Sequence, residues 1–245
     1  MNKKEIKKHV SAAEKLENIK NKTFVFIKEN IGKIAEYDAQ QFIISEFKKN
    51  KLIMDNIADK PIVAVGSNTS FMHYFPENKK SRIIRKNNLI MIDIWAGFKK
   101  KNSPFADITW IAYSGKKVPV GVNKIFKKVI RARDEAVKFI RKSLKNKKIP
   151  TGKDIDNICR KSFGKLKRNF IHNTGHSLGF HACHGGQFNL SQKNDKPIKI
   201  NIPFTIEPAL YFNRKFGIRS EIDCYINSDY KLIITTKVQK KIILI

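Results

Sequence analysis

Histidines gather in one short stretch of this chain. Of the six histidines in the sequence, His176, His181 and His184 lie within residues 175–184, and His172 lies just upstream. Imidazole is the commonest metal ligand in proteins and the side chain that titrates nearest neutral pH. Glycines on both sides let the backbone approach a bound group closely. The stretch is therefore a candidate metal or acid–base site, with a loop of solvated histidines as the alternative.

Four acidic residues lie in or beside segments that otherwise have the pattern of buried strands. The chain has only 21 acidic residues against 50 basic ones, so this placement is informative. A buried carboxylate is costly unless it is paired, hydrogen-bonded or bound to a metal. Four carboxylates and one imidazole form an oxygen-rich set that suits two divalent ions sharing bridging carboxylates. The set comprises Asp93, Asp107, Glu207, Glu221 and His176. For each carboxylate taken singly, a buried salt bridge to a lysine or to Arg219 is the alternative.

Helices are expected where apolar residues recur at helical spacing. Residues 1–50 contain two of them, the first with Ser11 and Glu14 as a capping box and the second capped by Asp38. Residues 1–10 are expected to be a loose N-terminal segment. The other expected helices are residues 121–147 and a segment that follows a cap formed by Thr151 and Asp154.

Strands are expected where short apolar runs end in turn residues. Residues 61–65 form such a run and lead into a loop with His73. Residues 89–96 and 107–113 are both strand-like, and a polar connector joins them, so an antiparallel pair is expected. The remaining expected strands are 200–206, 216–226, 232–238 and 242–245. Since no linker rich in Gly, Ser or Pro occurs, one α+β domain over residues 1–245 is the economical interpretation.

Composition limits the class of protein. A chain of 245 residues can bury a sizeable core, and 41% hydrophobic and 29% charged residues are typical of globular proteins. The three cysteines fall in no CxxC pair, which argues against a disulfide framework and fits a reducing compartment. We find no apolar segment typical of a signal peptide or a membrane span. A cytoplasmic protein without membrane partners is expected.

The formal net charge of +29 is extreme, and such an excess raises affinity for nucleic acids and anionic membranes. The lysines, however, are spread over nearly every segment. Lys, Ile and Asn are over-used together, as an AT-rich coding sequence produces without selection for binding. Specific nucleic-acid binding is therefore not expected.

Short segments around these residues, taken in order, resemble the motifs of the M24 metallopeptidases, the family of the creatinase/aminopeptidase or "pita-bread" fold. This family contains methionine aminopeptidases, Xaa-Pro aminopeptidases and prolidases. Any one motif is weak, but their order is specific, and the resemblance covers roughly residues 10–245. The matching segments are 65–74, 91–95, 106–110, 174–179, 204–211 and 217–223.

The resemblance implies an internally duplicated antiparallel sheet with helices outside and a dinuclear metal site at its centre. The implied ligands are the five residues named above, with Asp107 and Glu221 bridging the ions. Mn²⁺ or Co²⁺ is expected, with Fe²⁺ or Zn²⁺ as alternatives. The implied catalytic residues are His73, His184 and Glu207, and the implied substrate-binding residues are His73, His184 and Arg219.

One departure concerns the second histidine of the pattern. It usually follows the ligand histidine by seven residues, which here is Cys183, and His184 lies one residue further along. We interpret this as a one-residue insertion between Gly179 and His184. His181 is the alternative for the same role.

Variants such as Gly-His-Ser and Arg-Ser-Glu-Ile-Asp look closer to the Xaa-Pro peptidases than to methionine aminopeptidases. The expected function is removal of an N-terminal residue from Xaa-Pro peptides through a metal-activated water, by a catalytic domain only. A methionine aminopeptidase is the nearest alternative. A non-catalytic relative that binds protein or RNA is the alternative of another class. The expected partner is a peptide substrate, and a homodimer is left open.

Overall fold

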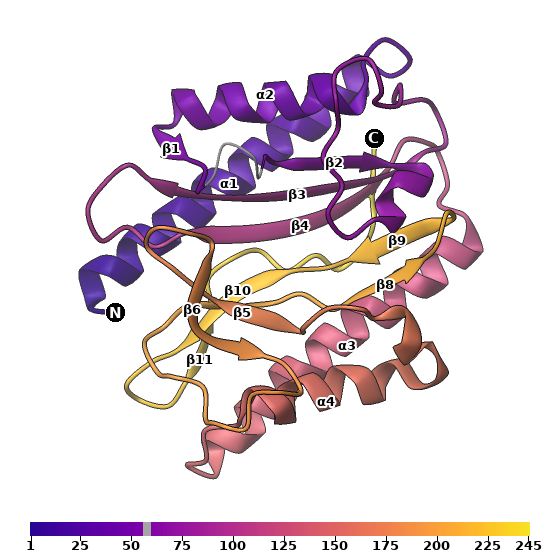
Figure 1. Cartoon of the computed structure of the whole chain (residues 1–245). Coiled ribbons are helices and arrows are strands. Elements are labelled where there is room, and N and C mark those ends of the chain that lie inside the picture. Colours follow the sequence, from indigo (N-terminus) through magenta and orange to yellow (C-terminus); the bar gives the residue numbers. More distant parts are fainter. Residues whose placement is uncertain (56–59) are drawn as a thin grey trace.

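The computed structural model describes residues 1–55 and 60–245, and the first half of the chain forms helices over a sheet (Figure 1). Helices α1 (Lys3–Glu29) and α2 (Glu36–Lys49) cover this sheet. Its central strand pairs antiparallel with three others, and the C-terminal strand joins the edge in parallel. The strands are β1 (Leu52–Ile53), β2 (Ile62–Val65), central β3 (Leu89–Phe98), β4 (Ala106–Tyr113) and C-terminal β12 (Ile243–Leu244).

The second half repeats this construction. Helices α3 (Val120–Lys145) and α4 (Gly152–Phe163) pack on each other and lie on the far side of a second sheet (Figure 1). In spatial order its strands are β11 (Leu232–Ile234), β10 (Ile222–Ile226), β7 (Phe204–Ile206), β5 (Gly175–Leu178) and β6 (His184–Leu190). A separate ribbon contains β8 (Ala209–Phe212) and β9 (Phe216–Arg219), and the 3₁₀ turns are η1 (Gly66–Ser70) and η2 (Gly164–Asn169).

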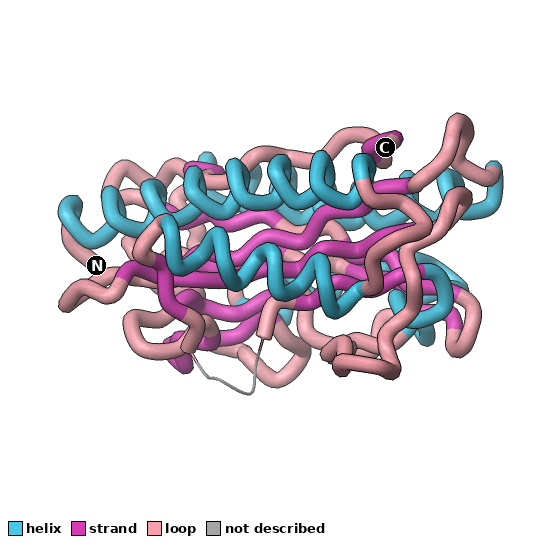
Figure 2. Tube along the Cα trace, turned by 90° about the horizontal axis from the view of Figure 1, so that it is seen from above, coloured by secondary structure: helices cyan, strands magenta, loops and turns pink. Residues whose placement is uncertain are grey.

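The strands lie between the two pairs of helices (Figure 1), and the view from above shows helices in front of the strands (Figure 2). Strand β3 is buried on both faces, so its alternate residues enter different cores. Ile90 and Ile92 pack in the core beneath α1 and α2, whereas Leu89 and Met91 pack in the core of the second half. The same alternation turns Asp93 towards the second half.

Two predicted helix starts were wrong. Helix α1 begins at an Asn2 cap, with Glu5 closing the capping box, so Ser11 lies in mid-helix. Residues 3–10, expected to be loose, are the first turns of this helix. His9 of this helix is buried. Both ring nitrogens have hydrogen-bond partners that offset the cost of burial: one lies 2.8 Å from the carbonyl oxygen of Phe105 and the other 2.8 Å from Thr235 Oγ1.

The predicted N-cap of α2 was also wrong. Asp38 is not its cap but lies in the first turn, where its carboxylate accepts from the backbone N–H of Ala35 at 2.8 Å. Thr151 and Asp154 do form the predicted capping box of α4. A capping signature therefore shows that the start of a helix is near, but the spacing alone does not tell which residue is the N-cap.

The strand predictions hold best where two strands that pair are consecutive in the chain. The antiparallel pairing of β3 and β4 is confirmed, with Asp93 opposite Thr109. The expected strand 216–226 is instead divided at Ser220 and Glu221, because β9 pairs with β8 whereas β10 pairs with β7. The chain changes sheets there, so Glu221 lies at the change. Over the described residues, no helix is long and apolar enough to cross a membrane.

Candidate metal centre

Both halves of the chain contribute to one cavity of about 310 Å³. Strands β3 and β4 supply Asp93 and Asp107, and strand β5 supplies His176. Glu207 directly follows β7, and Glu221 lies between β9 and β10. All five line the cavity, which is also lined by His73, Cys183, His184 and Arg219. The topology thus brings together the five residues that sequence reasoning grouped as metal ligands.

The potential ligand atoms lie at distances that a shared metal site requires. His176 Nε2 is 3.8 Å from Asp107 Oδ2 and 3.4 Å from Glu207 Oε1. Three overlapping groups have ligand atoms within 4.8 Å of one another: Asp93–Asp107–Glu221, His176–Glu207–Glu221 and Asp107–His176–Cys183. Asp107, His176 and Glu221 each belong to two groups. Of these three, only the carboxylates have two oxygens that two ions can share, so the arrangement is compatible with two ions.

The cluster is electrostatically strained unless a cation joins it. Burial, and then the neighbouring carboxylates, raise the pKa values of Asp107 and Glu221 well above their ordinary range. Burial also raises the pKa of Glu207 to about 7 and lowers that of His176 to about 3, so this imidazole is neutral. Asp107 Oδ1 is buried without a hydrogen-bond partner. The donor set therefore fits divalent ions, which favour ionised carboxylates and neutral imidazole.

Arg219 lies against the cluster rather than free in the cavity. Its Nη2 forms an ion pair with Asp93, its Nε donates to Thr109 Oγ1 at 3.0 Å, and its Nη1 donates to Tyr211 Oη at 3.1 Å. Thr109 Oγ1 lies 2.9 Å from Asp93 Oδ1 and 2.7 Å from Glu221 Oε2. This network fixes two carboxylates from opposite halves. Each of its three nitrogens has a protein partner, so its geometry favours positioning Asp93 over binding substrate.

The network extends to His172, whose place sequence reasoning left open. His172 Nε2 lies 3.3 Å from Tyr211 Oη, and its ring packs edge-on against Phe170. Burial, followed by the charge of Arg219, lowers the pKa of His172 to about 3. A neutral His172 therefore orients the tyrosine that receives a hydrogen bond from Arg219.

The other histidines are placed differently from one another. His73 and His184 line the cavity, and the rings of His184 and His176 lie 3.9 Å apart between centroids. All three of these histidines, His73, His181 and His184, are exposed, but His181 is not among the described residues that line the cavity. The pairing of β5 with β6 loses register between His176 and Leu178, next to this region. The placement supports His184 over His181 for the proposed second-histidine role.

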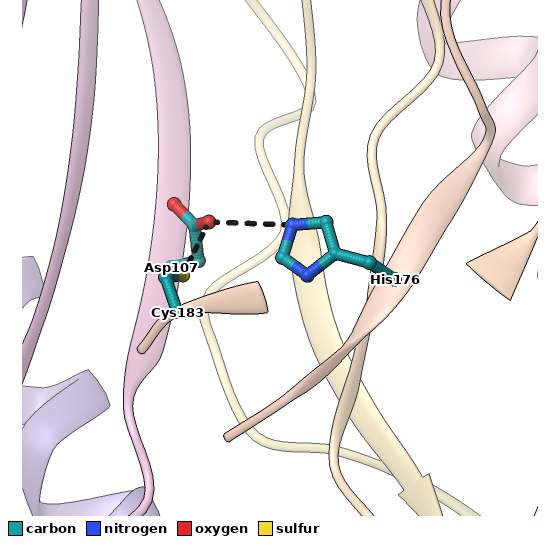
Figure 3. A group of neighbouring side chains, drawn as sticks. All are labelled: Asp107, His176 and Cys183. Atoms are coloured by element: carbon teal, nitrogen blue, oxygen red, sulfur yellow. Dashed lines mark hydrogen bonds and ion pairs between the residues drawn. The ribbon is translucent and has the colours of Figure 1, made fainter. Parts of the chain in front are cut away.

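Cys183 is the residue that sequence reasoning noticed but did not assign to the site. It is buried, and its Sγ lies 3.1 Å from Asp107 Oδ2 (Figure 3). Burial, followed by the neighbouring Asp107, raises the pKa of the Cys183 thiol. Its seven-residue spacing from His176 was the only sequence signal for this placement.

A buried carboxylate on α2 holds the loop that contains His73. Glu36 accepts from the backbone N–H groups of Val65 at 2.7 Å and Arg82 at 2.8 Å. It also accepts from Asn68 Nδ2 at 3.0 Å and Tyr74 Oη at 2.5 Å. Sequence reasoning missed Glu36, because a single acid in a charged amphipathic helix has the pattern of a solvated residue. The Asn and Tyr of segment 65–74 were the available signal, since both bind this carboxylate.

Exchange of Glu36 for Gln is expected to destabilise the protein by at least about 2 kcal/mol, since an amide group would face several donors. Thermal or urea unfolding measures the change. Glu29→Gln, at an exposed position near the end of α1, is the control. Equal stability of the two variants would contradict the structural role of Glu36.

Comparison with known proteins gives a consistent result. The sequence model of metallopeptidase family M24 matches residues 7–228. An uncharacterized peptidase of Methanocaldococcus jannaschii is 29% identical over 225 residues, covering 90% of this chain and 59% of the relative. The Xaa-Pro dipeptidase of Pyrococcus furiosus is 27% identical over 237 residues, covering 90% of this chain and 64% of the relative.

Solved structures agree with the sequence comparisons. The X-Pro aminopeptidase from Thermotoga maritima matches with a TM-score of 0.82 and 25% identity, over 100% of this chain and 64% of that protein. The chain thus spans about three-fifths of the length of these relatives.

Proposed function

Because this chain belongs to metallopeptidase family M24 and has its α+β pita-bread fold, we propose that it is a metal-dependent peptidase that releases an N-terminal residue, with Xaa-Pro peptides preferred. One observation supports this most strongly: four buried carboxylates and a neutral imidazole, from both halves, converge on a single cavity. Two relatives named for Xaa-Pro or X-Pro substrates support the preference.

Bound divalent ions would act as a Lewis acid and lower the pKa of a water molecule. Asp93, Asp107, His176, Glu207 and Glu221 would hold the ions. Glu207 lines the cavity beside the other proposed ligands, where its carboxylate would accept a proton and return it to the leaving amine. His73 and His184 line the same cavity and would hydrogen-bond the peptide at the bond that breaks.

The size of the cavity supports action on the end of a peptide. A volume of about 310 Å³ is at the low end of the range for ligand pockets. Ile62, Phe75 and Trp95 supply apolar lining, while the carboxylates would attract a free α-amine. These features suit a short apolar residue with a charged amino group.

A peptide panel tests the preference. With Mn²⁺ or Co²⁺ added, kcat/KM for Ala-Pro peptides is expected to exceed that for Met-Ala peptides by about tenfold or more. The metal content of the same samples is measured in parallel. The reverse ranking would indicate a methionine aminopeptidase. Bound metal without hydrolysis, together with salt-dependent RNA binding, would indicate a non-catalytic relative.

A further inference from the structure

Three side chains with different donor atoms face one another in the cavity (Figure 3). Asp107 Oδ2 lies 3.1 Å from Cys183 Sγ and 3.8 Å from His176 Nε2. Around a tetrahedral ion with bonds of about 2.3 Å to sulfur and about 2.0–2.1 Å to nitrogen or oxygen, neighbouring donor atoms lie roughly 3.3–3.6 Å apart. The two distances lie on either side of that range. These two distances need shifts of only a few tenths of an ångström, and the ligand atoms of all three residues lie within 4.8 Å of one another, so the three side chains are close enough to bind one ion.

Asp107 gives an independent sign that a cation belongs there. The side chain lines the cavity, is only 6% exposed, and its Oδ1 has no hydrogen-bond partner. An unsatisfied buried acceptor is destabilising. Since Oδ2 is the oxygen that faces Cys183 and His176, a cation would remove the deficit where it binds both oxygens of this carboxylate or where a second cation binds Oδ1.

The backbone fixes Cys183 in this position. Its N–H donates to Asp55 Oδ2 at 2.9 Å, and its carbonyl oxygen accepts from the N–H of Gly179 at 3.2 Å. The carbonyl oxygen of Gly179 accepts in turn from Phe105 at 2.9 Å. A Cβ on Gly179 would lie 2.5 Å from the Ala182 oxygen, so only glycine fits this turn. Because the thiol is already held towards Asp107, little ordering would accompany its coordination.

From these contacts we propose that Cys183 is a thiolate ligand of the metal centre, bound to the ion that His176 and Asp107 also bind. Coordination forms a metal–sulfur bond and breaks the S–H bond, and the proton is released to solvent. Cys183 stands seven residues after His176 and directly before His184, which keeps the proposed second-histidine role. The inference rests on the proposed function, since it concerns the same metal centre.

A thiolate changes which metals the centre prefers. Soft thiolate ligands favour zinc, whereas Mn²⁺ prefers carboxylate, carbonyl and water ligands. The centre should therefore favour Zn²⁺ or Co²⁺ over Mn²⁺. The family resemblance alone makes no distinction between Mn²⁺ and Co²⁺. Cys183→Ser should lower the affinity for Zn²⁺ relative to Mn²⁺ by at least about tenfold.

Absorption spectroscopy of the full chain loaded with Co²⁺ tests the ligand directly. The native protein is expected to show a near-ultraviolet sulfur-to-cobalt charge-transfer band. Cys183→Ser should lose this band and keep the visible bands of bound Co²⁺. Cys159→Ser is the matched control, because Cys159 is buried in the core, where its thiol donates to the Ala132 carbonyl oxygen. This control should keep the charge-transfer band.

The outcomes separate this inference from the proposed function. Bound Co²⁺ without the band in the native protein, or with an unchanged band in Cys183→Ser, would overturn the thiolate ligand and leave the metallopeptidase proposal intact. Failure to bind any divalent ion would overturn both. Should Cys183→Ser not fold, X-ray absorption of the native zinc-loaded protein decides the point, since the inference requires a sulfur at about 2.3 Å.

Discussion

Exchange of Glu207 for Gln is expected to lower kcat for peptide hydrolysis by about 10²–10⁴-fold, the usual contribution of general acid–base catalysis. The backbone fixes this residue, because its N–H donates to the Thr174 carbonyl oxygen at 2.8 Å, just after β7. Glutamine cannot accept and return the proton, and it removes one anionic metal ligand. Steady-state kinetics with a saturating metal concentration measure the loss.

The fold should survive this substitution. Since burial raises the pKa of Glu207 to about 7, much of the residue is already neutral in the metal-free protein near neutral pH. A glutamine resembles that neutral form in shape and charge. Glu46→Gln is the control, because Glu46 is a buried carboxylate of α2 that pairs with Lys22 and Lys49 and is not among the residues of the described chain that line the cavity. Retained hydrolysis in Glu207→Gln, or equal loss in the control, would remove Glu207 from the mechanism.

Divalent metal is expected to raise the melting temperature substantially. Ligand at 100 times its Kd stabilises a folded protein by about 2.7 kcal/mol. That corresponds to roughly 5–11 °C for a chain of this size. Differential scanning calorimetry or fluorimetry, with metal added and after chelation, measures the difference. No shift with any divalent ion would contradict a metal centre.

The size of that shift should depend on pH in a defined direction. Burial raises the folded-state pKa values of Asp107, Glu207 and Glu221, so folding takes up protons. The stability from these protons is present below the unfolded carboxyl pKa and is lost as pH rises through the folded value, about 7 for Glu207. The chelated protein should thus weaken between pH 6 and pH 8 relative to the metal-loaded protein. Metal binds the deprotonated carboxylates, so the metal-induced shift should be larger at pH 8.

Buried histidines outside the ligand set impose the opposite trend. Burial lowers the pKa of His9 to about 4, so its contribution is present above the unfolded value and is lost as pH falls below it. This loss of stability is the same in the metal-loaded and the chelated protein, so it does not change the difference between their melting temperatures. If metal raises the melting temperature equally at pH 6 and pH 8, the shift does not come from binding to the deprotonated buried carboxylates.

The five candidate ligands could be grouped from the sequence because acids in or beside apolar runs stand out and because the order of the segments resembles the family pattern. Asp93 and Asp107 stand out as acids within apolar runs, and a period of two decides which face they share. Glu221 was placed in one long strand, because periodicity does not reveal that the chain changes sheets there. The pairing partners that divide β9 from β10 are distant in sequence.

The contributions of Glu36 and Cys183 could not be predicted, for a related reason. Each acts through contacts with segments far away in the chain: Glu36 binds residues up to Arg82, and Cys183 contacts Asp55 and Asp107. The residue type gives no signal of such contacts. Only the family spacing marked Cys183 as unusual.

The division of the ligands between the two halves has a consequence for how the protein is made. Asp93 and Asp107 leave the ribosome before the second half of the chain, and Glu221 is the last of the proposed ligands to do so. The complete donor set therefore does not exist until synthesis has passed β9 and the two sheets have docked. Metal capture by the proposed centre would then be a late step of maturation, and bound metal would join the two sheets and slow their separation. Resistance to proteolysis should accordingly be gained in that last step rather than gradually along the chain.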